Sequence, residues 1–239
     1  MTAREGALAQ RRNRGADARR AQILSEALHL VGQNGYYGFG ISELAQRCKL
    51  TKPGLLHHFG SKDKLLIELV EERDQQLTTE LRDVLASIIR GRTPDNISKD
   101  EVLSTFHEIV VRNNREPEVV RFFTVLQTES LSQTHPAHAF FTAREARVLN
   151  RYIEMLAPHV ENPISAARQF MALMGGLERQ WLRSGQSFDL VAEWDSAAAR
   201  LLEANARQKK ANGAPRKQRQ RSAAAKTSCL VPSRQQNQQ

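Results

Sequence analysis

Residues 40–59 read GISELAQRCKLTKPGLLHHF, a pattern of two short amphipathic helices joined by a tight turn. Within it, the segments 41–47 and 52–58 each carry one small apolar face. Small or apolar side chains stand where two such helices must cross, namely Ala45, Leu50 and Leu55. The spacing therefore predicts a helix-turn-helix.

Residues with the chemistry of helix caps flank both segments. Gly40 is an acceptable N-cap for the first helix, and Glu43 at its third position supplies half of a capping box. Thr51 can cap the second helix, and Pro53 suits its first turn because a missing N–H costs nothing there. These local signals predict where both helices start.

The second helix of this motif begins with polar and basic groups. Short side chains at that position reach base edges and phosphates when the helix lies in a major groove. A lysine in the first turn of the next helix can reach a phosphate beside free backbone N–H groups. The predicted DNA-contacting residues are Arg19, Ser42, Thr51, Lys52, Gly54, His57, His58 and Lys62.

Three residues in or near this region invite another chemical interpretation. His57 and His58 could form a metal pair, but neighbours on a helix point about 100° apart and no third ligand is evident. Cys48 ends the first short helix, where a buried structural thiol is favoured over a redox switch. We therefore expect no metal and no cofactor.

Charge is concentrated at the two ends of the chain. The 239 residues carry a net charge of +9, yet residues 205–239 contain nine Lys and Arg and no acidic residue. Residues 1–22 add a net +4, which leaves the middle mildly acidic. Basic ends on such a body favour a polyanionic partner, most simply nucleic acid. The N-terminal arginines could enter a minor groove, and the basic tail could add phosphate contacts or have no role.

Composition excludes several classes of protein. Hydrophobic residues make up 40% of the chain and aromatic residues 6%, which favours helices rich in Leu, Ala and Val. No apolar run approaches the 18 or so residues of a membrane span, and the N-terminus lacks an apolar signal core, so we expect a cytoplasmic protein. No nucleophile–base set, metal motif or phosphate loop is visible, so we expect no enzyme.

Helical periodicity continues on both sides of the motif. An apolar face at Ile23, Ala27, Leu30 and Val31 predicts a helix from Asp17 to Asn34-Gly35. Further helices are predicted from Ser61 to 89 and over 101–113, 117–132, 136–156, 163–183 and 188–207. The expected fold is all-α with nine helices. It divides into a flexible basic arm (1–16), a helix-turn-helix domain (17–62), a helical effector-binding and dimerisation domain (63–207) and a disordered basic tail (208–239).

Many ordered positions between Arg20 and Val70 resemble the tetracycline-repressor (TetR) family of regulators. They are Arg20, Ile23, Leu24, Ala27, Leu28, Gly35, Ile41, Leu44-Ala45, Leu50-Thr51-Lys52-Pro53, Leu55, His58-Phe59, Ser61-Lys62 and Leu65-Leu66. Segments 125–129, 135–141, 176–182 and 188–190 are similar to one branch of that family. Two residues depart from the pattern: Lys49 stands where the family usually has Gly, and Leu56 where it usually has Tyr. The resemblance implies nine helices and a dimer formed by the last two.

The C-terminal half offers two sets of candidate residues. Apolar faces on the last two helices predict a dimer interface at Phe170, Gly176, Leu177, Trp181, Trp194, Ala198 and Leu201. Aromatic and Met side chains could line an effector cavity at Phe106, Phe122, Leu126, Phe140, Met171 and Met174. The same positions are equally expected of an ordinary core.

The resemblance implies a homodimeric, sequence-specific transcriptional regulator of double-stranded DNA, in the family's usual mode a repressor released from its operator by a small molecule. The alternative is a nonspecific architectural nucleic-acid-binding protein that acts through its basic ends. Activation in place of repression, the effector and the operator sequence stay open at this point.

Overall fold

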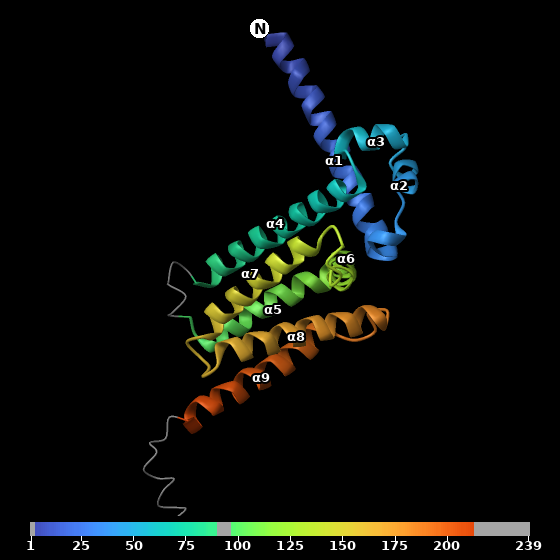
Figure 1. Cartoon of the computed structure of the whole chain (residues 1–239). Coiled ribbons are helices and arrows are strands. Elements are labelled where there is room, and N and C mark those ends of the chain that lie inside the picture. Colours follow the sequence, from blue (N-terminus) through green and yellow to red (C-terminus); the bar gives the residue numbers. More distant parts are fainter. Residues whose placement is uncertain (1–2, 90–96, 213–239) are drawn as a thin grey trace, which may run out of the picture.

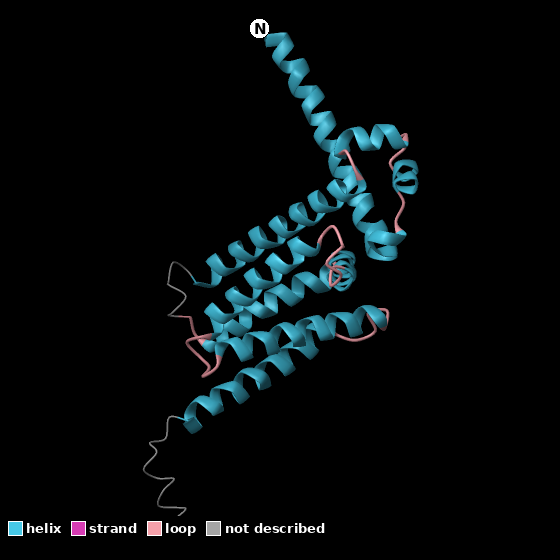
Figure 2. Cartoon of the chain, viewed as in Figure 1, coloured by secondary structure: helices cyan, strands magenta, loops and turns pink. Residues whose placement is uncertain are grey.

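Nine helices make up the described part of the chain (Figure 1). The computed structural model describes residues 3–89 and 97–212, with side chains for 17–88 and 97–206. The helices are α1 (Ala3–Gly38), α2 (Ile41–Arg47), α3 (Lys52–Phe59), α4 (Lys62–Ile89), α5 (Lys99–Arg115), α6 (Pro117–Glu129), α7 (His138–Leu156), α8 (Pro163–Arg183) and α9 (Leu190–Asn212). These residues contain no strand (Figure 2), so the all-α prediction is confirmed.

The first helix is longer than predicted. It begins at Ala3, which corrects the expectation of a flexible arm over 1–16; residues 1–2 lie outside the described chain. Ala, Arg, Gln and Glu dominate this stretch and are strong helix formers, so a helix that has nucleated further along can extend into it. At the other end, Gly35 leaves the helical region with φ 70° and ψ 176°. The predicted break at Asn34-Gly35 is therefore present inside α1.

A first cluster of buried side chains, the N-terminal core, joins the helix-turn-helix to the helices around it. It combines Ile23, Leu44, Leu55 and Leu66 of α1 to α4 with the wholly buried Phe122 of α6. The predicted boundary between residues 62 and 63 is therefore no break in packing, because apolar side chains from both sides share one core.

A second cluster, the C-terminal core, lies among the remaining helices. Phe106 of α5, Tyr152 of α7, Phe170 of α8 and Trp194 of α9 meet there, with the Phe106 and Phe170 rings stacked at 5.1 Å. In Figure 1, α4, α5, α7 and α8 run roughly alongside one another, and α9 follows α8 on the outer side. The bundle leads away from α2 and α3, which sit at one end of the molecule.

Several helix ends differ from the predicted ones. α6 ends at Glu129 rather than 132, and α7 begins at His138 rather than 136. α9 begins at Leu190, because the Asp189 carboxylate accepts hydrogen bonds from the N–H groups of Val191 and Ala192, each over 3.0 Å. α9 runs on to Asn212, so residues 208–212 of the predicted tail are helical, and 213–239 lie outside the described chain.

Candidate nucleic-acid interface

The helix-turn-helix is packed through the small apolar faces that its sequence suggests. Leu44 and Ala45 of α2 and Leu55 and Phe59 of α3 are all buried. Cys48, which caps α2, is also buried, and burial raises the pKa of its thiol. A thiol kept protonated by burial is a poor nucleophile, which fits the predicted structural role.

The start of α3 is held by the predicted cap. The Thr51 hydroxyl oxygen accepts a hydrogen bond from the Gly54 N–H over 3.1 Å, and the Thr51 carbonyl accepts from the Leu55 N–H over 2.9 Å. Pro53 lies in the first turn. These contacts fix the direction in which the first residues of α3 leave the surface.

Most of the predicted DNA-contacting side chains point to solvent. Ser42, Thr51, Lys52, His57 and His58 are exposed, and Gly54 is half-buried. No acidic residue lies between Lys49 and Ser61, so nothing in that stretch opposes a phosphate. A short exposed helix with a cation in its capped first turn and two imidazoles in its last turn can donate to both base edges and phosphates.

Two of the predicted contacts are engaged within the protein. One guanidinium N–H of Arg19 points to the Cys48 carbonyl oxygen over 3.4 Å, which ties α1 to the turn. The Lys62 ammonium lies 4.5 Å from the ring centroids of both Tyr36 and Phe39. This placement desolvates the ammonium and lowers its pKa. Lys62 is therefore held against two aromatic rings and is less exposed than the predicted DNA-contacting side chains of α3.

The turn of the motif holds an unfavourable backbone conformation. Lys49 has φ 54°, in the left-handed region that glycine adopts without cost. Its N–H donates to the Gln46 carbonyl over 3.0 Å, and the next N–H, of Leu50, donates to the Ala45 carbonyl over 2.8 Å. Position 49 thus has the left-handed backbone conformation that would suit the glycine usual at this position in the resembled family. Lys49 adopts it although its Cβ disfavours it. Lys49 is itself exposed beside α3 and was missed as a candidate contact, although its charge was visible in the sequence.

The predicted effector residues do not lie together. Phe122, Leu126 and Phe140 pack in or against the N-terminal core, whereas Phe106, Met171 and Met174 pack in or against the C-terminal core. None of the six lines the pocket described below, so their role in an effector site stays a prediction. Periodicity identified the residues as apolar but could not assign them to separate cores.

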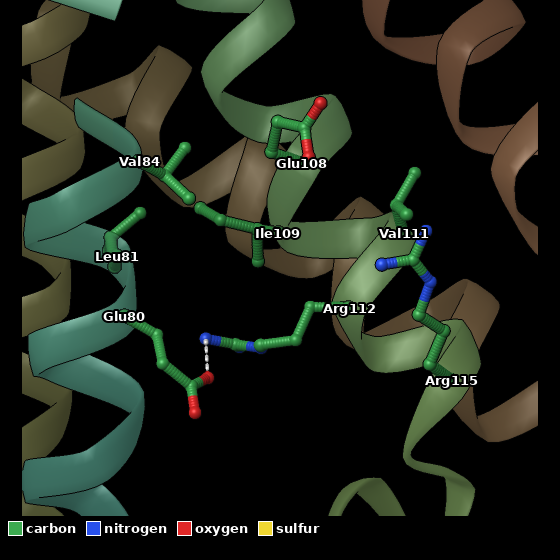
Figure 3. Close-up of a pocket in the computed structure, with 8 residues that line it drawn as sticks. All are labelled: Glu80, Leu81, Val84, Glu108, Ile109, Val111, Arg112 and Arg115. Atoms are coloured by element: carbon green, nitrogen blue, oxygen red, sulfur yellow. Dashed lines mark ion pairs between the residues drawn. The ribbon is translucent and has the colours of Figure 1, made fainter. Parts of the chain in front are cut away.

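A pocket of about 200 Å³ opens between α4 and α5 (Figure 3). Its wall is mixed: Leu81, Val84, Ile109 and Val111 are apolar, and Glu80, Glu108, Arg112 and Arg115 are charged. Arg112 reaches across toward Glu80, with 3.9 Å between the guanidinium nitrogen and the carboxylate oxygen. Desolvation lowers the pKa of Arg112, and of the four charged side chains in this pocket it is the least exposed to water. The pocket can hold a small molecule that has both polar and apolar parts.

The predicted dimer residues divide into buried and accessible ones. Phe170, Trp181, Trp194 and Ala198 are buried in the protomer's own C-terminal core, so they are not available to a partner. This corrects the prediction for those four residues. Gly176, Leu177 and Leu201 remain partly exposed.

The described residues contain no group of three or more His, Cys, Asp or Glu side chains arranged for a metal ion. A separate search of the same residues finds no helix that is long and apolar enough to cross a membrane.

Residues 23–69 match the family model described as "Bacterial regulatory proteins, tetR family". The chain is 32% identical over 76 residues to the HTH-type transcriptional activator FasR of Mycolicibacterium smegmatis, an alignment that covers 32% of this chain and 35% of FasR. It is 34% identical over 67 residues to the HTH-type transcriptional regulator LmrA of Bacillus subtilis, covering 28% of this chain and 36% of LmrA. The chain thus matches about a third of the length of these relatives.

Solved structures are similar over most of the chain. A TetR-family transcriptional regulator from Streptomyces coelicolor superimposes with a TM-score of 0.64 and 21% identity, covering 79% of this chain and 96% of that one. FadR of Bacillus subtilis, solved in complex with stearoyl-CoA, gives a TM-score of 0.61 and 16% identity, covering 76% and 97%. At these identities the likeness shows a shared fold, and the predicted architecture is confirmed.

Proposed function

We propose that the chain is a sequence-specific transcriptional regulator of the tetR family of bacterial regulatory proteins, whose model matches residues 23–69. A homodimer would place its two α3 helices in successive major grooves of one operator. The observation that carries this proposal is the exposed surface of α3. Thr51 caps its start, Lys52 is exposed in its first turn, and His57 and His58 are exposed in its last turn. Because the ligand we propose is DNA, we also propose that the protein acts in the cytoplasm.

We propose that the dimer forms through the outer faces of α8 and α9. Ala172 and Gly176 lie one turn apart on α8, and Ala192, Ser196 and Ala199 repeat along α9. All are exposed or partly exposed, and apart from the adjacent residues and backbone of α8 itself no atom lies within 4 Å of where a Cβ would stand at Gly176. A glycine inside a helix costs about 1 kcal/mol relative to alanine. Close approach of a second copy would offset that cost, with Leu177 and Leu201 at the contact.

We propose the pocket between α4 and α5 as the effector site. Arg112 pairs only loosely with Glu80, so an anionic group on a ligand can displace that contact. The apolar side chains of Leu81, Val84 and Ile109 would receive the rest of the molecule. Binding that favours one conformer of the dimer lowers operator affinity by its differential free energy. Since FadR carries stearoyl-CoA, acyl-CoA thioesters are among the first ligands to test.

The deciding experiment is a binding titration against DNA from upstream of the gene, with a scrambled duplex as control, at several salt concentrations. We expect a preference of roughly 10³-fold or more for one site. Lys52→Ala and His57→Ala should remove it, whereas Lys99→Ala, an exposed lysine at the far end of α5, should leave it intact. If no site is preferred, and selection from genomic fragments also enriches none, the regulator proposal falls and a nonspecific architectural role replaces it.

A further inference from the structure

One carboxylate adds a hydrogen bond between the end of α1 and the end of α6, which also pack through apolar side chains. Oε2 of Glu129 accepts a hydrogen bond over 2.8 Å from the backbone N–H of Tyr36, a residue 93 positions away in the sequence. The break at Gly35 takes the Tyr36 N–H out of the helical ladder, so Glu129 supplies the acceptor that the helix no longer provides. The contact therefore replaces a helical hydrogen bond with an interdomain one.

The absence of a side chain at Gly35 leaves room for this carboxylate. Its φ of 70° favours glycine, and a Cβ at this position would stand 2.2 Å from Oε1 of Glu129. Any side chain at position 35 would push the Glu129 carboxylate away from Tyr36. The backbone break and the acceptor are thus built to fit each other.

His135, in the loop between α6 and α7, packs beside both Glu129 and Tyr36. Its Nδ1 accepts from the Ala137 N–H over 3.1 Å, so in the neutral ring the proton lies on Nε2. That Nε2 is buried, lies 3.7 Å from Oε2 of Glu129 and has no hydrogen-bond partner among the described residues. Burial is the largest influence on the imidazole and lowers its pKa, which keeps the ring neutral against the charged carboxylate. The rings of Tyr36 and His135 meet edge to face at 5.1 Å.

Tyr36 extends the connection to α4. Its hydroxyl donates a hydrogen bond to the Asp63 carboxylate, and the Lys62 ammonium lies over its ring. α4 follows α3 after a two-residue turn and runs into the C-terminal bundle. The end of α1, the start of α4 and the end of α6 therefore converge on Tyr36 and Glu129.

We infer that Glu129 is the positioning residue through which the C-terminal helices hold the helix-turn-helix in its DNA-binding orientation. This inference rests on the proposed function, because it concerns how operator binding depends on the rest of the chain. Glu129 touches no DNA; it acts through the backbone of Tyr36. Loss of its carboxylate takes away the acceptor of the Tyr36 N–H and loosens the end of α1, while the apolar packing of α1 on α6 stays in place. The recognition helices of a dimer then hold their common spacing less firmly.

The test compares Glu129→Ala, Glu129→Gln and Glu118→Ala in the full-length protein. Glu118 is a matched control, since it also lies on α6 and faces α1, with its Oε2 3.6 Å from Nδ1 of His29, but does not touch Tyr36. We expect Glu129→Ala to weaken operator binding about tenfold, within the range usual for coupling between sites, with binding to scrambled DNA unchanged. Glu129→Gln keeps an oxygen acceptor and should restore most of the affinity. Glu118→Ala should bind as the unmodified protein does.

Hydrogen exchange supplies a readout that general destabilisation would not reproduce. The Tyr36 amide should exchange faster in Glu129→Ala and regain protection in Glu129→Gln, with exchange in α8 unchanged. Should Glu129→Ala fail to fold, Gly35→Ala displaces the same carboxylate and should give the same loss of operator binding. Unaltered operator affinity in Glu129→Ala or in Gly35→Ala, measured on a protein that does discriminate its operator, would overturn the inference. A protein that discriminates no operator would instead overturn the proposed function.

Discussion

The ammonium of Lys62 lies 4.5 Å from the ring centroid of Tyr36, and Phe39 faces it at the same distance. A lysine in the first turn of a helix is well placed for a phosphate, but this one is half-buried on two aromatic faces. Moving it to DNA would give up two cation–π contacts. We therefore expect Lys62 to stabilise the junction of α1 and α4 rather than to neutralise a phosphate.

Lys62→Gln should lower the free energy of unfolding by about 0.5–1 kcal/mol, the usual worth of such contacts. The salt dependence of operator binding should stay the same. Lys52→Gln, at the exposed start of α3, is the matched comparison and should reduce the salt slope by about 1. An equal loss of slope in both variants would show that Lys62 does reach a phosphate.

Lys49→Gly should stabilise the protein. The left-handed backbone of Lys49 costs a non-glycine residue about 1–2 kcal/mol. The greater freedom of glycine in the unfolded chain takes back part of that, which leaves a gain of about 0.5 kcal/mol or more. Urea denaturation measures it. Lys49→Ala removes the same charge but keeps a Cβ, so it should bring no gain; a gain as large as that of glycine would point to charge instead of backbone strain.

Thr51→Ala removes the side-chain cap of α3 and should cost about 1 kcal/mol of stability. Operator affinity should fall as well, because the first turn of the recognition helix frays. Thr51→Ser keeps the hydroxyl oxygen and should keep most of the stability and most of the operator affinity. Thermal unfolding and the operator titration check the pair, and an alanine variant as stable as the serine variant would contradict the capping role.

Glu178→Gln should stabilise the protein at pH 8 and have little effect at pH 5. Burial raises the pKa of Glu178 to about 7, against the lowering influence of the hydrogen bond from Asn113 and of Arg112, Arg144 and Arg179. Its folded pKa thus lies above the unfolded value, so its contribution is most favourable at low pH and is lost as the pH rises through 7. We expect a gain on the order of 1–2 kcal/mol at pH 8.

Urea denaturation at both pH values tests this expectation, with the exposed Glu145→Gln as control. The change in free energy of unfolding caused by Glu145→Gln should be the same at pH 5 and at pH 8. A stabilisation of Glu178→Gln that does not change with pH would mean that the carboxyl is not the titrating group.

Gly176→Glu should convert the proposed α8–α9 dimer to a monomer. Inside a single protomer this change fills open space and improves helix propensity, so it should not destabilise α8. At a close contact between two copies, it would introduce a buried charge opposite its own symmetry mate. Sedimentation velocity reports the change, with Ala146→Glu on the exposed face of α7 as control. A dimer that survives Gly176→Glu would place the interface elsewhere.

Local signals predicted much of the fold and of the candidate interface. Thr51 and Gly40 cap α3 and α2 as expected, and Pro117 and Pro163 begin α6 and α8. Asp189 was a cap signal that could have placed the start of α9 correctly. Each of these effects acts within one helical turn, so the neighbouring residues suffice to predict it.

Two other helix starts were missed because apolar periodicity does not report what sets them. α7 begins two residues later than predicted because the buried His135 binds the Ala137 N–H and holds Pro136 in a turn. α1 begins earlier than predicted because residues 3–16 are mostly good helix formers and continue the helix, although they have no apolar periodicity. Apolar periodicity reports burial and not the helical state itself.

The sequence by itself determined nine helices, a helix-turn-helix and a recognition helix with an exposed cationic start. Only the tertiary structure decided which apolar faces meet: Phe122 and Phe106 lie in different cores, and Trp194 packs inside its own protomer instead of against a partner. It also brought Glu129 to Tyr36 across 93 positions. The physical reason is that hydrophobic burial has no direction, so a periodic stripe predicts that a face is covered but not by what. Helix caps are directional and local, and so the sequence could predict them.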